Sequence, residues 1–308
     1  MLSPPANWLP QAPLDPLHLD WLTNANIEVA ILRLDQIDPL ISGNKWFKLT
    51  EHLKAADQAG AKGIISLGGA HSNHLHALAA AGKRFGFTTV GLLRGHPQQT
   101  PTVNDLQAFG MHLHWLGFAG YRARHEAGFW EPWQAQYPDL LAVPEGGGGL
   151  PGAQGCLPLK ALACRQLNDL GWNDYDGWWL ACGTGTTLAG LVMAEAGEHP
   201  VYGALAVPDD HGVAQQVERI LAQAGVSDPS YELFDASRGG FAKVDSLLLE
   251  FIEQTEQASG IPLEPLYTGK ALLALKQQVE AGKFAPGTRL IFIHTGGLQG
   301  RRGFSSKT

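Results

Sequence analysis

A lysine that could react as an amine follows a tight turn in the segment Ser42-Gly43-Asn44-Lys45. Glycine lets the backbone turn sharply there, and the asparagine side chain can hydrogen-bond locally. Because a helix is expected to follow, the lysine amine is held at a helix entry, where it is better placed to form an imine than on a mobile surface. The alternative is an ordinary solvated lysine, the state of most lysines in proteins.

A loop rich in glycine and threonine predicts an anion site between a buried strand and a helix. It consists of Cys182, Gly183, Thr184, Gly185, Thr186 and Thr187. Backbone amides and hydroxyls of such a loop can face a phosphate, and the helix N-terminus adds positive charge. The loop lacks the endings that define nucleotide-binding P-loops and dinucleotide-binding loops. The alternative is a plain glycine turn in which Thr186 or Thr187 caps the helix.

Polar residues also follow a glycine turn at Gly68 and Gly69, where Ser72, Asn73 and His74 open a helix. The neighbouring histidines lack acidic or thiol partners at ligand spacing, so we expect pocket or capping roles for them and no metal.

Two further segments near the C-terminal end place polar residues at the ends of elements. Tyr267-Thr268-Gly269-Lys270 precedes a helix, and the buried strand Leu290 to Ile293 runs into His294-Thr295-Gly296-Gly297. Polar side chains at the end of a buried strand often form sites in α/β proteins, although a glycine-capped strand end is the simpler interpretation.

The elements that must position these residues alternate between strand and helix patterns, which indicates parallel sheets with right-handed crossovers. Strands are expected at 27–34, 63–67, 88–93, 112–115, 177–181, 201–207 and 290–293, and helices at 46–56, 74–85, 105–109, 157–170 and 187–196. The cluster of glycine and proline at 144–152 predicts a linker between two lobes. Ligands bind where strand ends and helix N-termini converge, so we expect the site between the lobes.

Composition narrows the kind of partner. The chain has 308 residues, 44% of them hydrophobic, and a formal net charge of −7. Scattered basic residues give no footprint for nucleic acid or an anionic membrane, so a small-molecule substrate is expected. Three cysteines without a paired spacing fit a reducing cytoplasm. Residues 1–22 do not have the pattern of a signal peptide, and no apolar run is long enough to span a bilayer.

Taken together and in order, five segments resemble the D-cysteine desulfhydrase and 1-aminocyclopropane-1-carboxylate (ACC) deaminase family. They are SGNKWFKL, GGAHSNHLHALAAAGKRFG, CGTGTTLAG, LYTGKALLAL and FIHTGG, within residues 41–297. The resemblance implies a two-lobed α/β enzyme of pyridoxal-5′-phosphate (PLP) fold type II, similar to tryptophan synthase β, with a mainly parallel sheet flanked by helices in each lobe. It also implies a large PLP-binding domain (1–48 and 150–308), a small domain (49–149) and a homodimer.

The same resemblance implies roles for individual residues. Lys45 would carry PLP as an imine, Lys48 would lie near its phosphate, and Asn73 would bond its phenolic oxygen. Ser72 would contact the substrate carboxylate or move a proton, and Tyr267 would exchange a proton at the leaving group. The loop from Cys182 to Thr187 would hold the phosphate, Thr268 and Thr295 would lie beside the pyridine nitrogen, and Ser72, Asn73, His74 and Tyr267 would contact the substrate.

Departures from the family's patterns bear on the substrate. ACC deaminases read Y-E-G-K and H-L-G-G where this chain has Thr268 and Thr295. Neutral hydroxyls would leave the pyridine nitrogen unprotonated, which makes a weaker electron sink and favours β-elimination over ring opening. A further tyrosine of ACC deaminases has no clear counterpart near Gly239 to Lys243. D-cysteine desulfhydrases read N-K-T-R-K, whereas Trp46 and Phe47 stand here, either as core residues or as a reshaped pocket.

The sequence therefore predicts a PLP-dependent lyase that converts D-cysteine to pyruvate, hydrogen sulfide and ammonia. The alternatives within the fold are ACC deamination to 2-oxobutanoate and ammonia (a hydrolase-type reaction), serine dehydration and racemisation. Outside it, the chain would be a non-catalytic PLP-binding protein or a nucleotide-binding module.

Overall fold

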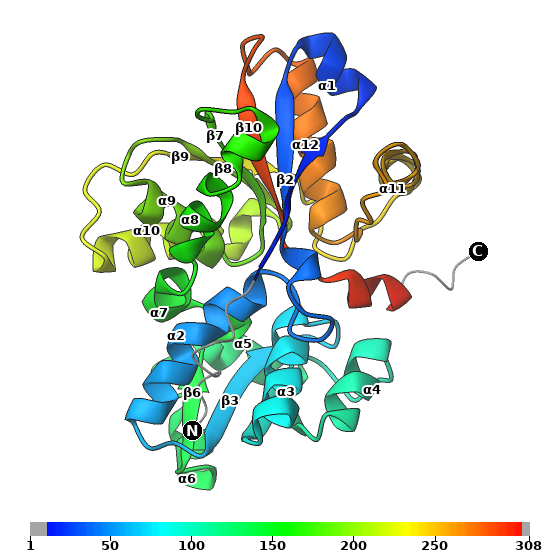
Figure 1. The fold of residues 1–308 in the computed structure, drawn as a ribbon. Coiled ribbons are helices and arrows are strands. Elements are labelled where there is room, and N and C mark those ends of the chain that lie inside the picture. Colours follow the sequence, from blue (N-terminus) through cyan, green and yellow to red (C-terminus); the bar gives the residue numbers. More distant parts are fainter. Residues whose placement is uncertain (1–10, 304–308) are drawn as a thin grey trace.

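The computed structural model describes residues 11–303, and two sheets organise this part of the chain (Figure 1). The six-stranded sheet has the order β1 (Leu14–Leu17), β2 (Glu28–Arg33), β10 (Arg289–His294), β7 (Gly177–Cys182), β8 (Val201–Leu205) and β9 (Tyr231–Asp235). The four-stranded sheet has the order β5 (His112–Trp115), β4 (Thr88–Leu93), β3 (Gly63–Gly68) and β6 (Leu140–Val143). Every pairing is parallel except that of β1 with β2. The predicted fold class is confirmed.

Helices cover these sheets, and five of them carry or support the candidate site. They are α2 (Asn44–Gln58), α3 (Asn73–Phe85), α9 (Thr186–Glu195), α11 (Ser246–Ser259) and α12 (Thr268–Glu280). The others are α1 (Asp20–Ala25), α4 (Pro101–Ala108), α5 (Gly117–Arg122), α6 (Glu131–Gln136), α7 (Gly149–Gln154), α8 (Pro158–Cys164) and α10 (Val213–Gln223). Single turns of 3₁₀ helix lie at Leu34–Gln36, Ala123–His125, Glu145–Gly147, Leu167–Leu170, Asp209–His211 and Leu298–Gly303.

Burial on both faces explains the continuous apolar runs of the central strands. Along β7, Trp178 and Leu180 pack into one hydrophobic cluster while Trp179 packs into a second cluster on the opposite face of the sheet. All six residues of β7 are buried. Because successive side chains of a strand point to opposite faces, helices on both sides are required to cover such a strand.

One sequence-based expectation about the middle of the chain needs correction, and the linker expected at 144–152 is an ordered segment. The glycine-rich segment after Val143 connects the small sheet to the rest of the chain, but it is ordered as the Glu145–Gly147 turn followed by α7, which contacts α2 and α9. The single helix expected at 157–170 is α8 followed by a separate 3₁₀ turn. The break lies at Gln166 (φ −111°), whose side chain bonds the backbone of Ala12 and Leu14 beside β1.

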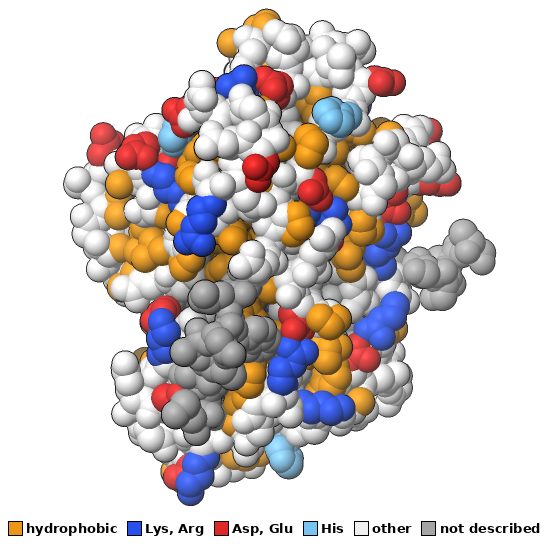
Figure 2. Space-filling model, in the orientation of Figure 1, with side chains coloured by type: hydrophobic (Ala, Val, Ile, Leu, Met, Phe, Trp, Pro, Cys, Tyr) orange, Lys and Arg blue, Asp and Glu red, His pale blue; other side chains and the backbone are white. Residues whose placement is uncertain are grey.

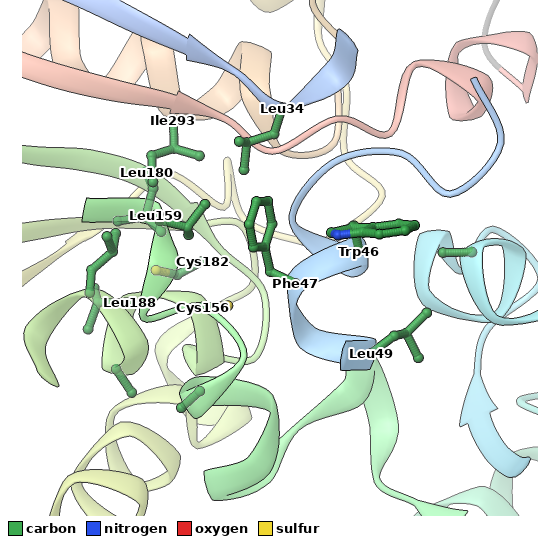
Figure 3. Close-up of a cluster of buried hydrophobic side chains, with 14 of the residues drawn as sticks. Leu34, Trp46, Phe47, Leu49, Cys156, Leu159, Leu180, Cys182, Leu188 and Ile293 are labelled. Carbon is green, nitrogen blue, oxygen red and sulfur yellow. The ribbon is translucent and has the colours of Figure 1, made fainter. Parts of the chain in front are cut away.

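Trp46 and Phe47 are core residues, 5% and 3% exposed. Figure 3 shows Phe47 pointing toward Leu34 and Leu159, while Trp46 points to the other side of α2, toward α3. The first of the two alternatives for this pair is therefore supported.

The surface face drawn in Figure 2 intersperses basic and acidic side chains and shows no large field of one sign. Among the described helices, none is both long enough and apolar enough to cross a membrane. The division into domains at 1–48, 49–149 and 150–308 stays a prediction, and its residues 1–10 and 304–308 lie outside the described part, as does the first half of the segment judged against a signal peptide.

Candidate active site

The turn that carries Lys45 is held between two strand ends of the six-stranded sheet. Gly43 has φ +73°, and a Cβ at this position would lie 2.0 Å from the carbonyl oxygen of Thr295, which follows β10. The backbone amide of Asn44 donates to the same oxygen over 3.2 Å. The Asn44 side chain donates from Nδ2 to Oγ1 of Thr187 (2.9 Å), in the first turn of α9, which follows β7, and its Oδ1 accepts from Nζ of Lys45 (2.9 Å). The sequence therefore needs glycine at 43 for close approach as well as for the left-handed turn.

Two of the three lysines of α2, Lys45 and Lys48, share a dry environment. Burial and the neighbouring Lys48 hold the pKa of Lys45 well below its usual value, although Lys45 stays partly exposed on its outer side. Burial lowers the pKa of Lys48 to about 8. Burial disfavours the charged form of an amine, so this environment favours the neutral, nucleophilic form of Lys45 more than water does.

The predicted anion loop meets Lys48 at the N-terminus of α9. Nζ of Lys48 donates to Oγ1 of Thr184 and to the carbonyl oxygen of Gly146, each over 3.2 Å, and Thr184 and Thr186 exchange a hydrogen bond of 3.0 Å. Gly185 has φ +70° and begins the helix, whose first amides have no intrahelical acceptor. Lysine, hydroxyls and helix-end amides form the donor set that proteins use for phosphate.

The aromatic ring of Tyr267 packs against the anion loop. A Cβ at Gly183 would lie 3.0 Å from Cε1 of Tyr267, so the ring of Tyr267 covers the loop. Burial raises the pKa of Tyr267, with the negative charges of Glu264 and Glu145 as further causes, so its hydroxyl keeps its proton.

The residues at the start of α3 approach from the four-stranded sheet. Oγ of Ser72 accepts from the amide of Leu75 (3.2 Å) and caps the helix, which leaves its own proton to donate. Oδ1 of Asn73 accepts from Nε2 of Gln299 (2.9 Å). His74 is buried and bonds Ser66 through Nε2 (2.7 Å), while its Nδ1 has no partner in the described residues. Its expected substrate contact stays a prediction.

Glu264 is a buried carboxylate that the sequence reasoning missed. It is 1% exposed, and its oxygens accept from the backbone amides of Leu266, Tyr267 and Thr268 at the start of α12. Burial raises its pKa to about 7, against the opposing effect of those amides and of Lys270. The Thr268 hydroxyl is engaged with the Glu264 backbone. A carboxyl group therefore lies close to Thr268, and the expected place of Thr268 and Thr295 beside the pyridine nitrogen stays a prediction.

Lys270 fastens a neighbouring loop. Its buried Nζ donates to the carbonyl oxygens of Ser237, Gly240 and Phe241, each over 2.9 Å. The Phe241 ring packs edge-on against Tyr267 at a centroid distance of 5.5 Å. This is the stretch where the sequence lacks the further tyrosine, and the structure places an aromatic ring there.

One group in the described residues has ligand atoms close enough for a metal, and it lies at the C-terminal end of α9, the end opposite the anion loop. It comprises Glu195, Glu198 and His199. Both carboxylates already bind the ammonium of Lys160, and Glu195 also accepts from Tyr175, Trp178 and His199. The buried charge is thus already neutralised by protein groups.

The structure brings Lys45, Lys48, the 182–187 loop, Tyr267, Thr268, Asn73 and Thr295 together at the junction of the two sheets. Residues 11–296 match the family described as "Pyridoxal-phosphate dependent enzyme". The chain belongs to this family. Its cofactor is therefore pyridoxal phosphate, and the alternative of a nucleotide-binding module loses its support.

Several relatives support the family resemblance, and each aligns over most of its length. A Pyrococcus furiosus protein provisionally named 1-aminocyclopropane-1-carboxylate deaminase is 30% identical over 87% of this chain and 84% of the relative. The mitochondrial bifunctional D-cysteine desulfhydrase/1-aminocyclopropane-1-carboxylate deaminase of Arabidopsis thaliana is 27% identical over 94% and 76%. A Klebsiella pneumoniae D-cysteine desulfhydrase is 25% identical over 88% and 87%. The solved structure of an ACC deaminase homologue covers 100% of this chain and 94% of its own, with a TM-score of 0.80 and 24% identity, which confirms fold type II.

The residues present fit this cofactor. Lys48, Thr184, Thr186 and the first turn of α9 form a phosphate cradle that a side chain at Gly183 would narrow. Lys45 supplies an amine with a lowered pKa for the aldehyde carbon. The amine of Lys45 and the cradle lysine Lys48 lie on the same helix, and the rest of the cradle lies in the loop that Lys48 contacts. This arrangement matches a ligand with a phosphate at one end and a reactive carbon at the other.

Proposed function

We propose that this enzyme catalyses β-elimination from a small amino acid, with D-cysteine as the substrate, giving pyruvate, hydrogen sulfide and ammonia. The observation that carries this proposal is the pair of buried lysines on α2, one beside the phosphate cradle and the other held at the turn by Asn44. When bound, pyridoxal phosphate supplies an electron sink for the charge that forms at the substrate Cα.

The protein's own groups then divide the proton transfers. Lys45, with its lowered pKa, takes the proton from Cα as a general base. Tyr267 keeps its proton up to high pH and donates it to the departing sulfur. Ser72, with a free hydroxyl proton beyond its capping bond, donates to the substrate carboxylate.

ACC deamination is the second candidate, and the Glu264 carboxylate favours it. An ionised Glu264 facing the ring nitrogen would raise the share of protonated cofactor, which ring opening requires more than β-elimination does. Phe241 argues against ACC deamination. It lies in the stretch where ACC deaminases have a further tyrosine, and a phenyl ring has no hydroxyl proton to donate.

Two measurements test the proposal. Purified enzyme is assayed with D-cysteine and with ACC, scoring sulfide with pyruvate against 2-oxobutanoate. We expect sulfide release; 2-oxobutanoate without sulfide would replace the first candidate by the second. The Lys45→Ala variant should lose the imine absorbance near roughly 410–420 nm, a property of the cofactor. Lys54→Ala, an exposed lysine of the same helix that pairs with Glu51, is the matched control and should keep the band.

The proposal also covers the cellular compartment and the oligomeric state of the enzyme. We infer a cytoplasmic homodimer from the three unpaired cysteines and from the family resemblance. Size-exclusion chromatography with light scattering checks the dimer, and a monomer at micromolar concentration would overturn it.

A further inference from the structure

A hydrogen bond joins the two ends of the candidate site across 226 residues of sequence. Nε2 of Gln299, in the 3₁₀ turn Leu298–Gly303, donates to Oδ1 of Asn73, the first residue of α3, over 2.9 Å. An asparagine amide has an acceptor end and a donor end of nearly the same shape, so only its partners determine which end faces which neighbour. Gln299 occupies the acceptor end of Asn73.

The donor end of Asn73 is consequently left on the side of the Lys45 turn. Nδ2 lies beside Gly297, where a Cβ would come within 2.6 Å of it, and Gly297 has φ +86°. The preceding Gly296 touches Gly43, since a Cβ on Gly296 would lie 2.7 Å from the Gly43 Cα. Within the described residues, no hydrogen-bond acceptor is assigned to Nδ2 of Asn73.

The turn that carries Gln299 is itself anchored on both sides. Arg302 forms a two-point ion pair with Asp105 of α4, and Asp105 also bonds His76 of α3 (3.1 Å). Arg301 pairs with Glu256 of α11 over 2.6 and 3.0 Å. Figure 1 shows this red turn between the part with α11 and the part with α3 and α4. A partner fixed in this way can hold another side chain in one orientation.

We propose that Gln299 is a positioning residue that orients the Asn73 amide so that its N–H, and not its oxygen, faces the phenolic oxygen of the bound cofactor. The inference rests on the proposed function and on the contact between Asn73 and that oxygen which the family resemblance implies. A donor at this point stabilises the ionised phenolic oxygen, whereas an amide oxygen would repel it. Gln299 acts through Asn73 and does not itself touch the cofactor.

Two substitutions separate this role from simple packing. Gln299→Met removes the donor and leaves Asn73 free to turn. Gln299→Glu keeps the shape but can only accept, so it would draw Nδ2 of Asn73 toward itself and turn Oδ1 to the cofactor. A packing role predicts that the isosteric Glu variant is the milder one. An orienting role predicts instead that the Glu variant is the more damaging of the two.

The readouts are the absorbance spectrum of the holoenzyme and the dissociation constant of pyridoxal phosphate. We expect binding to weaken about 5-fold in Gln299→Met and about 30-fold in Gln299→Glu, with loss of the long-wavelength band in the same order. In an Asn73→Ala background, neither change should have a further effect. Thermal melting confirms folding, and if Gln299→Met does not fold, the Glu variant alone and with Asn73→Ala carries the test.

Two outcomes overturn the inference: a Glu variant no worse than the Met variant, or Gln299 effects that persist without Asn73. Failure of the proposed function is distinguishable from either. A wild-type enzyme without the band or without sulfide release would refute the function, whereas a normal wild type with unaffected Gln299 variants would refute the orienting role alone.

Discussion

The backbone amide of Asn44 donates to the carbonyl oxygen of Thr295 over 3.2 Å, so the end of β10 directly holds the turn that presents Lys45. The two segments approach so closely that glycine is the one residue that fits at 43, where both φ and space exclude a side chain. The reactive amine is thus positioned by main-chain packing before any ligand binds.

Gly43→Ala tests this close approach. We expect the free energy of unfolding in urea to fall by about 3 kcal/mol or more and the imine band to be lost, because the turn must move away from Thr295. Gly60→Ala is the matched control, since Gly60 has φ +65° but nothing within 4 Å of a Cβ. Backbone strain alone should cost the control about 1 kcal/mol. Equal losses in the two variants would contradict the steric argument.

Lys48 should make phosphate binding depend on pH. Its pKa of about 8 lies below the ordinary lysine value, so the ammonium is present below pH 8 and is lost as the pH rises through that value. We expect the affinity for inorganic phosphate, measured by calorimetry, to be highest below pH 8 and to fall up to tenfold per pH unit above it. Lys48→Met should bind weakly, with a flatter profile above pH 8. An unchanged slope in that variant would contradict the assignment.

Lys270 should be required for order in the loop at 237–241. Lys270→Met leaves three carbonyl oxygens without their charged donor, and we expect about 3 kcal/mol lower stability with faster amide exchange in that loop. Lys276→Met, on the same helix with an exposed ion pair to Glu280, should cost less than about 0.5 kcal/mol. If exchange in the loop stays slow in Lys270→Met, the fastening role is wrong.

Ser72 should contribute both to helix capping and to turnover. A control variant at another capping residue, Thr100, distinguishes these two contributions. Ser72→Ala and Thr100→Ala each remove a hydroxyl that caps a helix, α3 and α4 respectively, so each should lose about 1 kcal/mol of stability. Only Ser72→Ala should lower the rate of sulfide release, by about 100-fold or more, because the Thr100 hydroxyl already donates to the carbonyl oxygen of Ala70 and has no proton left for a substrate. Similar rate losses in both variants would reduce Ser72 to a structural role.

The local part of the site could be predicted from sequence because its signals are local. Lys45, Asn73 and Thr184 each lie at or just after a glycine turn at an element boundary, and turn chemistry depends on neighbouring residues. The roles expected of Lys48 and Asn73 came from the family resemblance and not from these turns. The alternation of apolar runs likewise predicted both parallel sheets.

Glu264 and Gln299 could not be found in the same way. An acidic residue just before a helix is the ordinary sign of an exposed cap, and nothing in its neighbours reveals the burial that raises the pKa of Glu264. A polar residue between glycines after a strand has no local pattern, and the partner of Gln299 lies 226 residues away. The break at Gln166 has the same origin, since its side chain bonds residues near β1. Long-range contacts override local preference in each case.

The position of β10 has a consequence for the order in which the protein is made. This strand fills the centre of the six-stranded sheet, between β2 and β7, yet it is the last strand of the described chain to leave the ribosome. Until then β2 lacks its parallel neighbour and the amide of Asn44 lacks its acceptor. A nascent chain therefore cannot present a fixed Lys45 amine, and the capture of an aldehyde cofactor is coupled to the completion of synthesis.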